Sequence, residues 1–77
     1  MSMYNLVVIN LDTTRSRTLL NTSSKLAVTN KMCSYITRLG LDDNSVITLQ
    51  RDANHYTMFY HPIIKTFCVL RLKKIIA

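Results

Sequence analysis

The fold is decided by residues 23–39, SSKLAVTNKMCSYITRL, because no other stretch of the chain has the pattern of a long helix. Apolar residues recur there at about 3.6 residues per turn and form one stripe: Val28, Met32, Tyr35, Ile36 and Leu39. The serines at residues 23–24 suit a helix N-cap, and Gly40 suits the left-handed residue that follows a helix C-terminus.

The stripe on this helix is wider than contact with one sheet requires. Leu26, Cys33 and Thr37 extend it around the cylinder. They either face a second surface or form the flank of a well-packed helix. The polar side of the helix carries Asn30, Lys31, Ser34 and Arg38.

Strands are predicted on both sides of the helix, at residues 4–11, 17–20, 45–51, 55–60 and 66–72. The first and last are apolar on both faces, which is typical of central strands, so we expect them to be neighbours. Residues 45–51 alternate in two sets and predict a half-buried strand. Turn-forming residues fill the connections at 12–16, 42–44, 52–54 and 61–65.

These elements predict one domain over residues 1–77, of the α/β class in its α+β form. We expect a five-stranded antiparallel sheet with one helix on one face, in the order strand–strand–helix–strand–strand–strand. The other face has apolar residues but nothing in this chain to cover it. Exposed apolar patches usually mark interfaces, so we expect another protein to supply the missing layer.

Composition limits the classes of function. Ten basic and four acidic residues give a net charge of +6, which suits nucleic acid, an anionic membrane or an acidic protein partner. The hydrophobic fraction of 48% argues against disorder. No secretory, lipidation or membrane-spanning pattern is present, so we expect free thiols at Cys33 and Cys68.

No catalytic constellation is evident. Every carboxylate lies in or beside a predicted turn, where turn chemistry explains it. Cys33 with His55 or His61 is the nearest approach to a nucleophile pair, but Cys33 is expected at a semi-buried position, where inert packing is commoner. Metal-ligand spacings and a glycine-rich phosphate loop are missing. We therefore expect no enzyme activity, no cofactor, no metal and no small-molecule substrate.

Nucleic-acid binding is the alternative hypothesis. The positive charge and the aromatic residues Tyr56, Phe59, Tyr60 and Phe67 are compatible with a sheet that stacks bases. Against it, the basic residues are dispersed along the chain, and the aromatic and glycine signature of RNA-recognition sheets is absent. We regard nucleic acid as the less favoured partner.

The chain resembles the roadblock family of small scaffold proteins over about residues 5–72. The matching segments are the apolar first strand Leu6-Val7-Val8-Ile9-Asn10, the helix at 23–39, the strand Ser45-Val46-Ile47-Thr48-Leu49-Gln50-Arg51, a strand ending near Pro62, and Phe67-Cys68-Val69-Leu70. The chain departs from the family by lacking helices before the first strand and after the last. It also has Thr13-Thr14-Arg15 where the first hairpin commonly has glycine.

The resemblance implies a trimmed roadblock (profilin-like) fold and a non-catalytic scaffold role. Roadblock subunits pair side by side, so it implies other roadblock-fold subunits as partners, or a homodimer in isolation. It points to the Ragulator-like EGO complex of yeast, which holds Rag-family GTPases at the cytoplasmic face of the vacuolar or lysosomal membrane and signals amino-acid sufficiency to the TOR kinase complex. Membrane attachment there belongs to a lipidated partner.

Members of the family pair through the helix and the strand after it, and the paired strands form one continuous sheet across the two subunits. Carried onto this chain, the resemblance places the partner interface at Lys31, Tyr35, Arg38, Val46, Thr48 and Gln50. Alternation alone does not decide which face of that strand points outward, because a slip of one residue inverts it.

Overall fold

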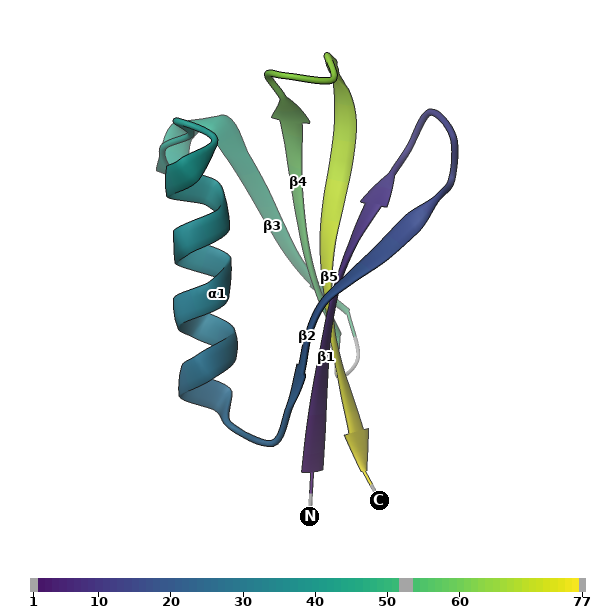
Figure 1. Cartoon of the computed structure of the whole chain (residues 1–77), viewed down its shortest axis with the longest axis vertical. Helices are drawn as coiled ribbons and strands as arrows, with labels where there is room; N and C mark the ends of the chain where they lie inside the picture. Colours follow the sequence, from purple (N-terminus) through teal and green to yellow (C-terminus); the bar gives the residue numbers. More distant parts are fainter. Residues whose placement is uncertain (1, 52–53, 77) are drawn as a thin grey trace.

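The computed structural model describes residues 2–51 and 54–76 and has an α+β architecture, in which one helix lies against one face of a twisted five-stranded sheet (Figure 1). The elements are β1 (Ser2–Asn10), β2 (Ser16–Thr22), α1 (Lys25–Arg38), a 3₁₀ turn (Asp43–Ser45), β3 (Val46–Arg51), β4 (Asn54–His61) and β5 (Thr66–Ile76). The predicted class and the order strand–strand–helix–strand–strand–strand are confirmed.

The strand order in the sheet is β2-β1-β5-β4-β3, and every neighbouring pair is antiparallel. β1 and β5 are therefore neighbours at the centre, as the doubly apolar runs predicted. Leu6 of β1 and Leu70 of β5 are fully buried. β5 joins two hairpins, because it pairs with β1 on one side and with β4 on the other.

Local signals fix both ends of α1. The side chain of Ser24 accepts a hydrogen bond from the Ala27 N–H at 3.2 Å, which caps the N-terminus. At the other end Gly40 has a φ of +74°, its N–H donates to the Thr37 carbonyl, and the Leu41 N–H donates to the Ile36 carbonyl. These two bonds form a Schellman motif, so glycine holds the left-handed position that ends the helix.

The core lies between α1 and the sheet. Leu6, Phe59, Cys68 and Leu70 form its buried centre, and the predicted helical stripe packs against the same side of the sheet. The rings of Tyr35 and Phe59 meet edge to face with centroids 5.9 Å apart. Val28 is the one helical residue of the described chain that is fully buried.

The first hairpin turns without glycine. The side-chain oxygen of Asn10 accepts hydrogen bonds from the N–H groups of Asp12 and Thr13, so Asn10, the last residue of β1, organises the turn. Thr14 takes the left-handed conformation, with a φ of +61°. Its N–H donates to the Asn10 carbonyl at 2.7 Å, which helps to hold a conformation that a β-branched residue rarely adopts.

Several expectations need correction. β5 continues through the expected tail to Ile76, because residues 73–76 pair with the start of β1. β3 is more exposed than a half-buried strand, since Ile47 and Leu49 are 59% and 60% exposed. Cys33 is exposed, and not semi-buried as expected. The predicted connection at 52–54 lies mostly outside the described residues.

Candidate partner interface

The pairing of β3 with β4 decides which side chains of β3 face the helix. Val46 pairs with Phe59, and Thr48 pairs with Thr57; Phe59 belongs to the core beneath α1. Cross-strand partners point to the same face of a sheet. Val46, Thr48 and Gln50 therefore point to the helix side, whereas Ile47 and Leu49 point to the opposite face.

β3 is also an edge strand. It pairs with β4 on one side, and no strand of the described chain lies on its other side (Figure 1). The backbone N–H and C=O groups along that side are free to pair with another chain. β2 forms the second edge of the sheet, at the opposite end of the strand order.

A groove of about 310 Å³ separates α1 from β3. Its helical wall includes Met32, Cys33, Ile36 and Thr37, and its strand wall includes Val46 and Thr48. Near the base, the hydroxyl oxygens of Thr48 and Thr57 lie 3.4 Å apart, within hydrogen-bond distance. The groove is mainly apolar and runs beside the open edge of β3; we call it the α1–β3 groove.

The six residues assigned to the interface do not all lie on one surface. Val46 and Thr48 line the α1–β3 groove, and Gln50 is exposed farther along β3, opposite His55. Lys31 and Arg38 are exposed, but the helical rotation of about 100° per residue places them on the flank of α1 away from Cys33 and Thr37. Tyr35 is half-buried and packs on Phe59.

Cys33 and Thr37 are the exposed helical residues of the groove that the interface assignment missed. The width of the helical stripe was the signal that could have found them, because both lie on its outer flank. Both are exposed beside the groove, so no surface of the described chain covers this flank, and contact with a second surface stays a prediction. Leu26, the third residue of this flank, is 70% exposed.

The sheet face opposite α1, here called the outer face, is largely apolar. Its side chains form rows that run across the strands. One row runs Val7, Arg71, Tyr56 and Leu49; the next runs Ile9, Val69, Met58 and Ile47; a third holds Leu11, Phe67 and Tyr60. Phe67 is 53% exposed and meets Tyr60 edge to face at 5.1 Å between ring centroids. The described chain supplies no layer over these rows, as the sequence predicted.

Arg71 is a charged group in the middle of this apolar face. Its cross-strand neighbours are Val7 and Tyr56, and its Nε is buried without a hydrogen-bond partner in the described part of the chain. A buried guanidinium nitrogen with no acceptor is costly. The outer face thus combines exposed apolar surface with one buried guanidinium nitrogen that has no acceptor among the described residues.

The residues considered for catalysis are not brought together. Cys33 lines the α1–β3 groove, whereas His55 and His61 line two other hollows. Asp42 caps the 3₁₀ turn by accepting from the Asn44 N–H at 3.0 Å. No group of three potential metal ligands occurs in the described part of the chain.

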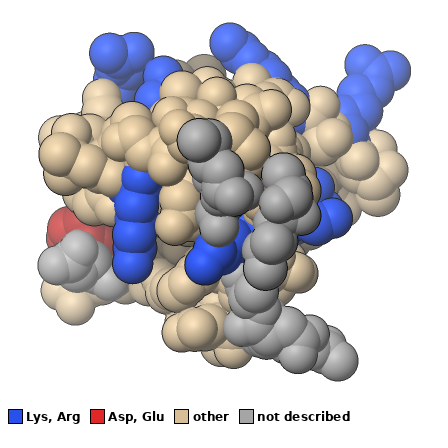
Figure 2. Space-filling model, turned by 90° about the horizontal axis from the view of Figure 1, so that it is seen from below, with Lys and Arg blue, Asp and Glu red and all other residues tan. Residues whose placement is uncertain are grey.

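The features that motivated the nucleic-acid hypothesis are separated in space. Phe59 is 1% exposed beneath α1, while Tyr56, Tyr60 and Phe67 lie on the outer face. Figure 2 shows the lysine and arginine side chains spread around the lower end of the molecule, with no single continuous stripe. Nucleic-acid binding stays a prediction.

Among the described residues, α1 is too short and too polar to cross a membrane.

Two titratable groups between α1 and the sheet, Tyr35 and Cys68, link stability to pH. Burial raises the pKa of the Cys68 thiol above its ordinary value of 9.0. Desolvation also raises the pKa of the Tyr35 hydroxyl above 10.0, with a further increase from Cys68 and an opposing effect of Arg17. Each group therefore keeps its proton more firmly in the folded chain than in the unfolded one.

From these shifts we expect stability to fall in alkali. Well below pH 9 both groups are protonated in both states. As the pH rises through 9 and then 10 the unfolded chain loses protons first, so the free energy of unfolding decreases. Urea denaturation at several pH values measures this slope. Cys68→Ala should flatten it, whereas the matched control Cys33→Ala, which removes the exposed thiol, should not. An identical alkaline slope in wild type and Cys68→Ala would contradict the expectation.

Comparison with known proteins identifies no relative: no family model, no curated protein and no solved structure matches the chain. The fold is established by the structure. Membership of the roadblock family stays a prediction, based on the segments quoted above.

Proposed function

We propose that this chain is a non-catalytic scaffold subunit that pairs side by side with another roadblock-fold subunit through β3 and α1. The observation that carries the proposal is the open edge of β3, which lies beside the apolar α1–β3 groove. Pairing edge to edge would extend the sheet into the partner and satisfy the free backbone groups of β3. The groove would be covered by the partner's helix.

Side-chain exposure favours the β3 edge as the pairing site. Ile47 and Leu49 project from this edge strand and are more than half exposed, so an extended sheet would shield them. The opposite edge is different, because the exposed stretch of β2 carries Ser16, Arg17 and Thr18. Burial of apolar surface contributes about 25 cal/mol per Å², which makes the β3 edge the more favourable one to cover.

The finer assignment comes from the roadblock resemblance. It places the paired subunits in a Ragulator-like complex that holds Rag-family GTPases and signals to the TOR kinase complex at the vacuolar or lysosomal membrane. A lipidated partner would supply the membrane contact. In this arrangement the chain provides a binding surface that positions its partners, and the catalytic activity belongs to the GTPases.

Co-expression with roadblock-fold subunits of the source cell tests the proposal. We expect a heterodimer by light scattering after size-exclusion chromatography, and slower amide hydrogen exchange in β3 and α1 than in the chain alone. A monodisperse, cooperatively folded monomer that captures no roadblock subunit would contradict the proposal. Protection at β2 in place of β3 would overturn the assigned edge. Retention of Rag-type GTPases by the purified pair tests the finer assignment separately.

A further inference from the structure

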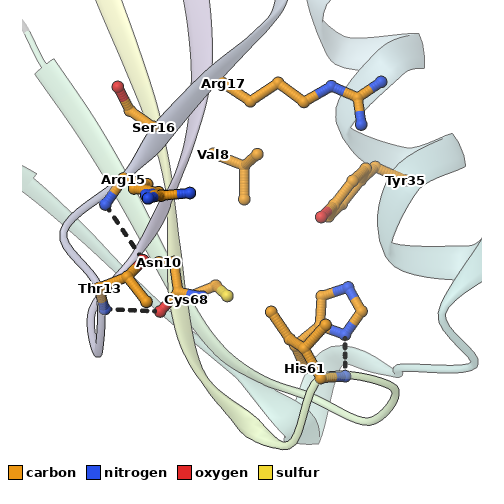
Figure 3. A pocket seen from close by; sticks show the side chains of 10 residues that line it. Val8, Asn10, Thr13, Arg15, Ser16, Arg17, Tyr35, His61 and Cys68 are labelled. Carbon is orange, nitrogen blue, oxygen red and sulfur yellow. Dashed lines mark hydrogen bonds between the residues drawn. The ribbon is translucent and has the colours of Figure 1, made fainter.

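A second hollow, on the helix side of the sheet but away from β3, includes two arginines, Arg15 and Arg17, in its lining. It has a volume of about 370 Å³ and lies among the C-terminal half of α1, the β1–β2 hairpin and the β4–β5 turn (Figure 3). We call it the basic hollow. The β1–β2 side of the sheet is opposite the β3 edge, so the basic hollow stays open when β3 pairs with a partner.

A β-bulge in the first hairpin builds one wall of the basic hollow. Leu6 pairs with Leu20 but Val7 pairs with Thr18, so Leu19 is an extra residue in β2. The bulge shifts the register by one residue and places Arg17 opposite Val8. Figure 3 shows the Arg17 side chain extending across the hollow toward Tyr35.

The electrostatics of the basic hollow favour an anion. Arg15 and Arg17 both line it, and none of its ten lining residues is acidic. Asp12, the carboxylate of the same hairpin, lines a different hollow with Phe67 of the outer face. Two guanidinium groups without a facing carboxylate create a positive potential inside a concave site.

Neutral hydrogen-bond donors complete the wall. The Nδ1 atom of His61 accepts from the N–H groups of Ile63 and Ile64 at 3.2 and 3.3 Å, so the proton of the neutral ring is on Nε2. The Tyr35 hydroxyl points into the hollow, and the other ring nitrogen of His61 lies toward Tyr35 (Figure 3). Val8 and the buried Cys68 supply an apolar floor.

We infer that the basic hollow binds a small phosphomonoester, with the phosphate at Arg15 and Arg17 and the apolar part against Val8 and Cys68. Guanidinium forks match phosphate oxygens bidentately, and a phosphate offers three terminal oxygens where a carboxylate offers two. The volume is in the range of about 300–1,000 Å³ that small-molecule sites occupy. The ligand is bound and not transformed, since no residue of the hollow forms a nucleophile–base pair.

Titration of the ¹⁵N-labelled full chain with phenyl phosphate tests the inference, with phenol and inorganic phosphate as comparison probes. We expect saturable shifts of the amides of Arg17, Tyr35 and His61 with phenyl phosphate, weaker binding of inorganic phosphate, and no binding of phenol. Arg17→Gln and Arg15→Gln should each weaken binding about tenfold, because each removes charge-assisted hydrogen bonds. Both arginines are exposed, so the variants should retain the fold.

Lys73→Gln is the matched control. It removes one positive charge from an exposed position on β5, where Lys73 pairs with Asn5 and Asn54 away from the hollow. Affinity within about twofold of wild type is expected, since distant surface charges are screened by salt. Equal losses in Lys73→Gln and Arg17→Gln would overturn the site in favour of diffuse attraction, and so would equal shifts with phenol. These results leave partner pairing untouched, so failure here is distinguishable from failure of the proposed function.

Discussion

Phe59→Ala is expected to lower the free energy of unfolding by about 3–5 kcal/mol, the usual cost of deleting a buried phenyl ring. Phe59 is 1% exposed and sits in the central cluster with Leu6, Cys68 and Leu70. Its ring also holds Tyr35 of α1 by an edge-to-face contact. The substitution therefore opens a cavity between α1 and the sheet, in the one buried cluster that the described residues form.

Such a loss is large for a domain of this size. At about 0.05–0.15 kcal/mol per residue, a chain of 77 residues has a total stability of about 4–12 kcal/mol. At the lower end of this range the loss equals the whole stability of the chain, and a substantial fraction of Phe59→Ala molecules would then be unfolded. Urea denaturation followed by circular dichroism measures the change.

Phe67→Ala provides a matched control, since it deletes the same side chain from the other face of the sheet. Phe67 is 53% exposed and contacts Tyr60 on the outer face. We expect a loss of about 1 kcal/mol, because a half-exposed ring leaves no closed cavity. Equal losses for Phe59→Ala and Phe67→Ala would mean that the core does not lie beneath α1.

Cys33→Arg is expected to weaken pairing with a roadblock-fold partner by about 2–5 kcal/mol, which is about 30-fold or more in Kd. Cys33 is exposed on α1 and lines the α1–β3 groove. An arginine there places a charge in a groove that the proposed partner covers, without disturbing the buried helical stripe. Isothermal titration calorimetry of the purified subunits measures the effect.

Ser34→Arg distinguishes between the two flanks of α1. Ser34 is exposed, does not line the groove, and lies on the flank that carries Lys31 and Arg38. We expect little change in Kd for this variant, although it adds the same side chain one residue away. If Ser34→Arg disrupts pairing and Cys33→Arg does not, the partner uses the flank assigned from the family resemblance, and the groove is not part of the interface.

The centre of the fold could be predicted from the sequence because its signals are local. The doubly apolar runs around Leu6 and Leu70 identify strands with no solvent face, and Gly40 marks the end of the helix. The extension of β5 could not be predicted, because Lys73 and Lys74 look like a solvated tail. They are ordered by pairing with Asn5 and Tyr4 of β1, a contact between residues far apart in the chain.

The candidate sites depend on register, which alternation alone does not fix. The two side-chain sets of β3 were evident from the sequence, but only the pairing of Val46 with Phe59 shows that Ile47 and Leu49 face outward. The basic hollow depends on the bulge at Leu19, which is a property of two strands together. No pattern within β2 itself predicts that Arg17 lies opposite Val8.

The central position of β5 has a consequence for how the molecule is made. The β1–β2 and β3–β4 hairpins have no strand pairing with each other, and only β5 bridges them. During synthesis, a ribosome that has released residues up to the β4–β5 turn exposes two separate hairpins, and isolated hairpins are at best marginally stable in water. The sheet closes only when β5 emerges, so the nascent chain is open to chaperones and proteases until nearly the end of this domain.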